Sequence, residues 1–443
     1  MNIIVSTIQH NALVNKNLLR NMLTFADRHD VRVIYLYVMP GKNKDETLLP
    51  QFEDERIELL FLGKEGKKLN SNLKLHDTKI LASQINPLTG FPSKLHRSFS
   101  YILPSPKIRY LSLPNTSTHP RFLATTGALT HGNYKDGSSG STNTAQGRKA
   151  ALEHEYGFAF VKIKNNRLFS YRPVMALKNG NFHYGREHYK NGKVYDEDPE
   201  ALILGDFHVG DTCMKSREAS LKQIEELRPK RVFFHDLFDG MSINHWERDN
   251  NLAKARAHAD GIYVLEDEVK ACLKELVTIA EMFPDQEFFV VESNHDIRLS
   301  RYISTENFLT DGQNSIFACK LFIAHMEQNS EPILKTAMEL VGEIPANVRF
   351  LAEDEEYRVQ GIGLSEHGHR GVNGARGSGA SFDRFNLKLI TGHEHTPKIY
   401  GNGMVVGTNT KLKLPYTRGP GSWMHANGLL YSSGKYTLLT IIH

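Results

Sequence analysis

The chain has 443 residues, of which 40% are hydrophobic and 23% charged, an ordinary composition for a globular protein of two or three domains. A net charge of +4 permits a nucleic-acid partner without requiring one. Three widely spaced cysteines exclude a disulfide framework, and no apolar segment approaches the length of a membrane span. Because the N-terminus also lacks a signal-peptide pattern, we expect a cytoplasmic protein without membrane insertion.

The first part of the chain, residues 1–195, opens with a predicted βαβ unit. Residues 3–8 and 31–38 have the pattern of strands, and residues 15–29 between them have the apolar spacing of a helix. Further short strands are predicted near residues 57–62, 99–103, 108–113, 157–163 and 168–172, with hairpins at 178–193. No glycine-rich phosphate loop follows the first strand, which argues against a nucleotide-binding domain. We interpret this part as an N-terminal α/β accessory domain for assembly or substrate control.

Residues 114–148 are the least regular segment, rich in Pro, Ser, Thr, Asn and Gly. Two interpretations remain open: a long flexible or oligomer-contacting loop, and a loop whose small polar residues approach nucleic-acid phosphates. The acidic segment at 196–199 is the predicted boundary between the first part and the second part, residues 196–443.

The second part repeats one pattern five times, in which a strand-like apolar segment ends in His, Asp or Asn. The five endings contain Asp206 and His208, Asp236, Asn294 and His295, His367 and His369, and His393 and His395. Open α/β sheets place ligand-binding residues at the carboxyl ends of their strands. A set of unrelated surface or core histidines would not repeat this order, so the pattern predicts one site built from five strand ends.

Helical segments separate these strands. They are predicted at 215–228 and 251–282, with a helical insert near 300–345 that forms a cap or an interface. Within the insert, the spacing of Phe317, Leu321, Phe322 and Met326 indicates a buried face. The last apolar segments, 404–407, 429–431 and 436–442, are predicted to close a second sheet. Alternation of strands and helices predicts a layered α/β fold.

Asp206 and His208 indicate the chemistry of the site. On a strand, side chains two residues apart leave the same face. A carboxylate oxygen beside an imidazole nitrogen suits a divalent transition metal.

The order D-x-H, D, N-H-D, H and G-H-x-H over about residues 200–410 resembles the calcineurin-like metallophosphoesterase superfamily. The resemblance implies a four-layer α/β sandwich, two mixed sheets flanked by helices, beside the N-terminal α/β domain. It also implies two divalent metals about 3.5–4 Å apart, which clamp both sides of an in-line phosphoryl displacement.

Transferred residue by residue, the resemblance gives a first metal held by Asp206, His208 and His395, a second held by Asn294, His367 and His393, and a bridging Asp236. His295 would protonate the leaving oxygen, and Asp296 would orient the imidazole of His295. The bridging carboxylate would hold two cations close, so that they lower the pKa of a shared water. Mn²⁺ is the expected metal, and Mg²⁺, Fe²⁺ and Zn²⁺ are accepted by the same ligand types.

Two positions depart from the family pattern, which has glycine before the bridging Asp and before the Asn. Here these residues are His235 and Ser293. Since glycine permits tight backbone geometry, the departure puts the two loop shapes in question. His235 is either an additional substrate contact or a structural residue.

A basic segment follows the fourth motif. His369, Arg370 and Arg376 are predicted substrate contacts, because neighbouring glycines let the backbone approach phosphates and arginine forms forked bonds to them. Residues 365–420 contain eight Lys or Arg against three Asp or Glu, which favours a polyanionic substrate. The alternative is a mobile loop with solvated arginines. Tyr416 and Trp423 could stack on bases or pack between C-terminal strands.

Within the superfamily, the motifs are similar to those of the nuclease branch, the double-strand-break-repair exonucleases. Segments that begin at Pro120, His367 and Gly407 resemble a group of bacteriophage DNA transfer proteins. This resemblance implies a metal-dependent DNase in the host cytoplasm, acting in host DNA degradation or phage DNA transfer. Its expected partners are DNA, further copies of itself as a homo-oligomer, and a phage or host protein.

Two alternatives stay open. A small-substrate phosphatase or cyclic-nucleotide phosphodiesterase would need no basic rim. A DNA-binding scaffold would have only minor activity.

Overall fold

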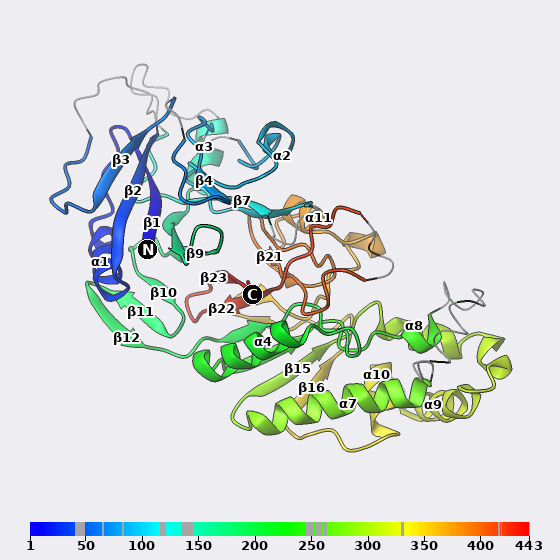
Figure 1. The fold of residues 1–443 in the computed structure, drawn as a ribbon. Coiled ribbons are helices and arrows are strands. Elements are labelled where there is room, and N and C mark those ends of the chain that lie inside the picture. Colours follow the sequence, from blue (N-terminus) through cyan, green and yellow to red (C-terminus); the bar gives the residue numbers. More distant parts are fainter. Residues whose placement is uncertain are drawn as a thin grey trace.

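The computed structural model describes residues 1–442 except 40–48, 64–65, 82–83, 116–120, 135–144, 245–251, 253–258, 260–263, 329–331, 415–416 and 418 (Figure 1). The described strands form sheets of eight, seven and six strands and one small hairpin. The fold is therefore α/β, as predicted, with several sheets, while the predicted four-layer metallophosphoesterase sandwich stays a prediction. None of the described helices is both long and apolar enough to cross a bilayer.

The eight-stranded sheet comes entirely from the first part of the chain. Its order is β12-β11-β10-β9-β8-β1-β2-β3. The strands are β1 (Asn2–Gln9), β2 (Val31–Met39), β3 (Ile57–Phe61), β8 (Tyr156–Ile163), β9 (Phe169–Ala176), β10 (Phe182–Tyr184), β11 (Glu187–Lys190) and β12 (Lys193–Asp196). Helix α1 (Lys16–Arg28) connects the parallel strands β1 and β2, and the Asn15 side chain caps it by accepting a hydrogen bond from the Leu18 N–H. The predicted βαβ unit is confirmed.

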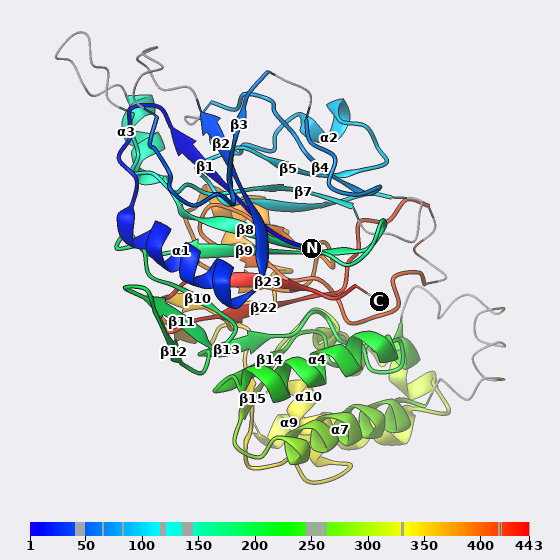
Figure 2. The same cartoon turned by 60° about the vertical axis from the view of Figure 1, so that its left-hand side comes forward.

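The six-stranded sheet has the order β16-β15-β14-β13-β22-β23. Its strands are β13 (Ala201–Ile203), β14 (Arg231–Phe234), β15 (Glu287–Val291), β16 (Val348–Leu351), β22 (Ala426–Leu430) and β23 (Tyr436–Thr440). Strands β13 to β16 are parallel, so their carboxyl ends meet at one edge. Its helices are α4 (Met214–Leu227), α7 (Leu265–Met282), α8 (Asp296–Ile303), α9 (Ser315–Gln328) and α10 (Ile333–Glu339). Figures 1 and 2 show α7, α9 and α10 gathered at one end of the molecule, away from β1 to β3.

The seven-stranded sheet combines both parts of the chain. Its order is β19-β21-β20-β6-β7-β5-β4. Four strands precede residue 195: β4 (Leu73–Leu75), β5 (Ser100–Leu103), β6 (Tyr110–Leu113) and β7 (Arg121–Thr125). Three follow it: β19 (Ile390–Thr391), β20 (Lys398–Ile399) and β21 (Met404–Val405). Helices α2 (Phe91–Lys94), α3 (Ala145–Leu152) and α11 (Gly379–Arg384) are further elements of the fold, and β17 (Arg358–Val359) pairs with β18 (Ile362–Gly363).

The structure corrects three sequence-based expectations. Strands β22 and β23 join the six-stranded sheet beside β13, not the second sheet. Strand β7 is fully buried within the segment predicted to be irregular, whose residues 116–120 and 135–144 lie outside the described part. In the helical insert Phe317 and Leu321 are buried as predicted, but Phe322 and Met326 are exposed. The division between residues 195 and 196 stays a prediction, although the strand partners of β6 lie on both sides of it.

The core follows from the alternation of side chains along the strands. On the six-stranded sheet, Ile203 and Phe233 face the other sheets, while Leu202 and Val232 face the helices. On the eight-stranded sheet, the alternate residues Ile4 and Ile34 pack against α1. The central core lies between the sheets, and Figure 2 shows β23 and β22 between β9 and β13, in agreement with the strand order β13-β22-β23 and the packing of β23 against β9. This arrangement fixes the strand ends that carry the candidate site.

Candidate metal centre

The loops after β13 and β14 run side by side and bring the first ligands together. The N–H groups of Phe207, His208 and Val209 donate to the carbonyls of residues 235, 236 and 237 at 2.7 to 3.0 Å. Asp206 and His208 were expected to share one face of a strand, but β13 already ends at Ile203, so both residues lie in the loop that follows it. They converge because His208 takes a left-handed backbone conformation, with φ of 45°.

The first group of ligand-type atoms contains Asp206, His208, Asp236 and His395, all buried and within 4.8 Å of one another. His395 Nε2 lies 2.9 Å from Asp206 Oδ2 and 3.3 Å from His208 Nε2. His208 Nε2 is 3.5 Å from Asp236 Oδ2. These are the residues predicted for the first metal together with the predicted bridging carboxylate.

The second group contains Asp236, His367 and His393, also within 4.8 Å of one another. His367 Nε2 lies 3.1 Å from Asp236 Oδ2 and 3.1 Å from Asn294 Oδ1. Asp236 thus belongs to both groups, and the structure brings all seven predicted metal ligands together.

Four of these seven residues have positive φ angles: His208, Asp236, His393 and His395, at 45°, 44°, 72° and 53°. Non-glycine residues adopt this region at a cost of about 1–3 kcal/mol each, and such strain gathers at functional sites. Residue 235 is His, where the resembled pattern has Gly. The loop takes its left-handed turn one residue later, at Asp236. The strained backbone aims all four side chains at one point.

Gly392 shows how closely the loops approach. A Cβ at this position would lie 2.2 Å from Asp206 Oδ1 and 2.9 Å from the His235 Cβ. The neighbouring His393 N–H donates to Asp206 Oδ1 at 3.1 Å. Glycine in the G-H-x-H motif is therefore required for contact between the fifth and the first motif.

The electrostatics fit a bound cation. Burial by itself would raise the pKa of Asp206, but the facing imidazoles, His395 foremost, lower it to about 2. Burial likewise opposes ionisation of Asp236, yet His367, His295 and His208 hold its pKa well below the ordinary value. Burial would lower the pKa of His367, and Asp236 outweighs it, raising that pKa to about 9. Two carboxylates are therefore ionised in a buried pocket.

The donor set also leaves an unused oxygen. Asp236 Oδ1 is buried and has no hydrogen-bond partner among the described residues. Buried polar atoms without a partner are rare in folded proteins, and a carboxylate oxygen between two histidine groups is a natural metal ligand. The residues present therefore fit one or two divalent cations.

Asp239 was not foreseen from the sequence as a site residue. Its Oδ1 lies 2.7 Å from His208 Nδ1, which leaves His208 Nε2 directed at Asp236 and His395. A carboxylate on the far nitrogen fixes the tautomer of a metal-binding imidazole. The signal was present in the sequence, because Asp239 follows Asp236 by three residues in the same loop.

Asp239, and not Asp296, positions His295. The carbonyl of Asp239 accepts a 2.6 Å hydrogen bond from His295 Nδ1, and its carboxylate is 3.4 Å from the same nitrogen. Asp296 Oδ2 instead accepts from the Ser293 N–H at 2.9 Å, which holds the loop that carries Asn294. The predicted orienting role of Asp296 is therefore corrected to a loop-stabilising one.

Arg298 is a second unforeseen residue. Its guanidinium donates to the Asp239 carbonyl at 2.8 Å and lies 3.2 Å from His295 Nε2. It stands one helical turn after His295 at the start of α8, so the spacing of the two residues could have indicated the contact.

Of the two interpretations of His235, the structural role fits better than the substrate contact, because its side chain is fully buried. Its Nδ1 lies 3.3 Å from His367 Nδ1, and burial followed by His367 lowers its pKa to about 3. A neutral His235 can accept the proton of His367 Nδ1 and so direct His367 Nε2 at Asp236. His235 thus orients His367, one of the predicted metal ligands.

The predicted basic rim is mixed. Arg370 Nε pairs with Glu353 at 2.7 Å, and His369 lies 3.0 Å from the same carboxylate. Arg376 is exposed and pairs with Arg370 through backbone bridges. The ring of His369 lies 6.0 Å from that of His393, so this residue borders the second ligand group.

A cleft of about 410 Å³ opens over the metal centre. Its lining includes His208, Asp236, Asn294, His295, Arg298 and Trp423. The Trp423 ring lies 4.2 Å from the His395 ring, at the wall of the cleft, whereas Tyr416 lies outside the described residues. The cleft therefore brings the ligand groups, His295 and Arg298 to one space.

Comparison with known proteins finds one similarity. Protein A1 of Escherichia phage T5 is 25% identical to this chain, over 98% of the chain and 81% of that protein. No protein-family model matches the chain, and no solved structure matches it. The likeness to a phage protein spans both parts of the chain, whereas membership of the metallophosphoesterase superfamily stays a prediction.

Proposed function

We propose that this chain is a two-metal phosphodiesterase that hydrolyses DNA. The observation that supports it most is the meeting of two ligand groups at one carboxylate: Asp236 belongs to both the Asp206–His208–His395 group and the His367–His393 group. A carboxylate shared in this way is what a pair of closely spaced divalent cations requires. Manganese is the proposed metal.

The pair of cations would supply positive charge that polarises a phosphodiester and lowers the pKa of a bound water. The protein would hold them through the seven ligands described above. Neutral Asn294 keeps the ligand set less negative than a third carboxylate would, and so leaves net positive charge for the substrate. His208 and His367 are held in the right tautomer by Asp239 and His235, respectively.

His295 is the proposed proton donor to the leaving oxygen. Its Nδ1 donates to the Asp239 carbonyl and lies 3.4 Å from the Asp239 carboxylate, so the doubly protonated ring would carry the transferable proton on Nε2, which lies 3.2 Å from Arg298 at the cleft. General acids of this kind contribute about 10²–10⁴-fold to a rate. Arg298, beside His295 Nε2, is the proposed contact to a non-bridging phosphate oxygen, because guanidinium groups bind such oxygens by forked hydrogen bonds.

DNA is the proposed substrate, and phage infection the proposed setting. The similarity to Protein A1 of Escherichia phage T5 supports a phage origin. The sequence resemblance to phage DNA transfer proteins supports action on host or phage DNA in the host cytoplasm. Homo-oligomer formation and a protein partner remain part of this proposal.

The decisive test is hydrolysis of linear duplex and single-stranded DNA with Mn²⁺, with Mg²⁺ or with EDTA, beside the small diester bis-p-nitrophenyl phosphate. Degradation of DNA with Mn²⁺ that EDTA abolishes is the expected result. Cleavage of the small diester alone would replace the proposal with a small-substrate phosphodiesterase.

The variant His295→Ala separates chemistry from binding. It should lose about 10²–10⁴-fold in DNA hydrolysis while Mn²⁺ and DNA binding remain. Leu309→Ala is a control, since this exposed residue lies on the helical insert. A wild-type protein that binds DNA and hydrolyses neither substrate would favour the scaffold alternative.

A further inference from the structure

A groove of about 970 Å³ lies on the seven-stranded sheet, apart from the metal centre. Three arginines line it, Arg97, Arg121 and Arg167, beside small polar residues such as Asn72 and Ser100. No Asp or Glu is among its described lining residues. The described lining is therefore basic without a compensating carboxylate, a composition that suits an anion, and three separated guanidinium groups could meet several phosphates in a row.

Arg121 is the buried arginine of the groove. It opens β7, is only 8% exposed, and its Nε donates to the Phe99 carbonyl at 3.2 Å. No carboxylate among the described residues forms an ion pair with it, and burial and then Arg97 lower its pKa. Buried charges are normally paired. The fixed Nε leaves the remaining guanidinium nitrogens for a ligand.

Arg167 is held at the rim by its backbone. The β8–β9 turn is fastened to the segment before β4: Ser71 N–H donates to the Asn166 carbonyl at 2.9 Å, and Asn72 Nδ2 to the Arg167 carbonyl at 2.9 Å. Arg97 stands on the turn between α2 and β5, two residues before the Phe99 carbonyl that Arg121 contacts. Three separate segments thus present arginine to one space.

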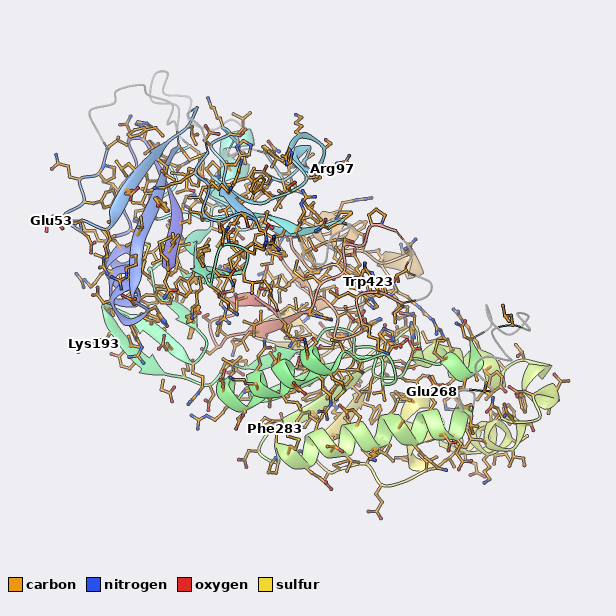
Figure 3. The ribbon with its side chains drawn as sticks, in the orientation of Figure 1. Glu53, Arg97, Lys193, Glu268, Phe283 and Trp423 are labelled. Atoms are coloured by element: carbon orange, nitrogen blue, oxygen red, sulfur yellow. The ribbon has the colours of Figure 1, made fainter. Side chains whose placement is uncertain are left out.

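The two ends of residues 420–423 line the groove and the cleft over the candidate metal centre, respectively. Pro420 lines the groove, and Trp423 lines the cleft. Between them, Gly421 forms backbone hydrogen bonds of 2.9 and 3.2 Å with Asn115 beside β6. Three residues span at most about 11 Å, a distance that a DNA strand covers in about three nucleotides at 3.4 Å each. Figure 3 labels Arg97 and Trp423 on the same side of the view.

We propose that this groove binds the phosphate backbone of the substrate strand a few nucleotides away from the bond that is cut. The inference rests on the proposed function and assigns the first part of the chain a share of the substrate site. It accounts for the shared seven-stranded sheet, because β6 and β7 fix the groove relative to the strands β19 to β21 that precede or follow the metal ligands.

The test compares two double variants of equal charge. Arg97→Gln with Arg167→Gln removes the two exposed groove arginines and leaves the buried Arg121. Arg20→Gln with Arg32→Gln removes two exposed arginines of α1 and β2 and serves as the control. Binding of a fluorescein-labelled 30-nucleotide single strand is followed by anisotropy in EDTA over a range of salt concentrations, and hydrolysis of bis-p-nitrophenyl phosphate is measured with Mn²⁺.

The groove variant should bind the strand about 10- to 30-fold more weakly at 0.1 M salt, with a salt slope reduced by about 1.4, since each phosphate contact to a single strand contributes about 0.7. The rate of small-diester hydrolysis by the groove variant should stay within about twofold of the wild-type rate, because that substrate does not reach the groove. The control variant should match wild type in both assays. Inorganic phosphate at equal phosphate concentration should compete poorly.

Equal strand affinity in the groove variant and the control would overturn the inference, even if the wild type cleaves both substrates. Strong competition by inorganic phosphate would replace the strand with free phosphate as the ligand. A wild type that hydrolyses no diester would instead overturn the proposed function, and weaker strand binding by the groove variant alone would then still support the groove.

Discussion

Two clusters of histidine and carboxylate side chains have their ligand-type atoms within 4.8 Å of one another. They differ in the backbone conformation that brings these atoms together. The metal centre joins five loop segments, and four of its residues have positive φ. The second cluster, His183, His188 and Glu197, lies on the regular strands β10 and β11 and directly after β12. His183 and His188 are direct cross-strand neighbours, so ordinary antiparallel pairing places their rings 4.1 Å apart.

The carboxylates differ as well. Both oxygens of Glu197 have partners: Oε1 accepts from Ser432, and Oε2 lies 2.8 Å from His188 and 3.3 Å from His183. Its side chain is 35% exposed, whereas that of Asp236 is 2% exposed and retains an unpartnered oxygen. Ligand types at short distance therefore do not by themselves indicate a metal site. Positive φ angles and an unpartnered carboxylate oxygen distinguish the candidate metal centre from the second cluster, whose unpartnered buried atom is the nitrogen His188 Nε2.

The largest expected difference is the effect on diester hydrolysis of replacing Asp236 or Glu197. Asp236→Asn should lower Mn²⁺-dependent diester hydrolysis about 10³-fold or more, because two metals contribute several kcal/mol to the transition state and each 1.4 kcal/mol is tenfold. Glu197→Gln should leave hydrolysis within about twofold. Steady-state rates and calorimetric Mn²⁺ binding of the two variants check these expectations. A large loss of hydrolysis in Glu197→Gln would contradict the distinction between the two clusters.

Residues that orient ligands should show intermediate effects. Asp239→Asn keeps the shape but weakens the contacts to His208 and His295, and should reduce metal affinity or activity about 10- to 100-fold. Ser432→Ala removes the corresponding contact to Glu197 and should change neither. If Asp239→Asn retained full activity at saturating Mn²⁺ and full Mn²⁺ affinity, the orienting role of Asp239 would be wrong.

Close backbone approach offers a third test. Gly392→Ala places a Cβ against Asp206 and should lower the free energy of unfolding by about 1–3 kcal/mol and weaken Mn²⁺ binding. Gly312→Ala is the matched control, since nothing lies within 4 Å of its Cβ position. Thermal melts with and without Mn²⁺ measure both effects. Equal melts for the two variants would contradict the proposed fit of the fifth motif against the first.

The smallest effect is a pH dependence. The pKa of His367 is raised from 6.5 to about 9 in the metal-free protein, so this imidazole is protonated at neutral pH. Its stabilising contribution is complete below pH 6.5 and is lost as the pH rises through 9. Metal-free protein should therefore become less stable over that interval, and Mn²⁺ affinity should rise up to tenfold per pH unit because binding displaces the proton.

His183, in the second cluster, should show no such pH dependence. Burial and then His188 lower the pKa of His183 to about 4, so His183 is neutral throughout this interval and contributes no change. Calorimetric proton release on Mn²⁺ binding, compared between wild type and His367→Gln, measures the contribution of His367 alone. Equal proton release by the two proteins would assign it to another group.

The sequence by itself determined the α/β class, the order of the ligands and their chemical types. Asp206, His208, Asp236, Asn294, His367, His393 and His395 could be named because each follows an apolar segment, and hydrophobic periodicity is a local property of the chain. The N-terminal βαβ unit was predictable for the same reason.

Tertiary structure decided how these residues are aimed and what supports them. Asp239 replaced Asp296 as the partner of His295, and His235 turned inward, because loop conformations with positive φ depend on neighbouring loops and leave no periodic signal. The seven-stranded sheet and its arginine groove arise from strands almost 300 residues apart, such as β6 and β20, whose pairing depends on packing between the two parts of the chain. Local sequence fixes which groups are available, and only long-range packing decides which of them meet.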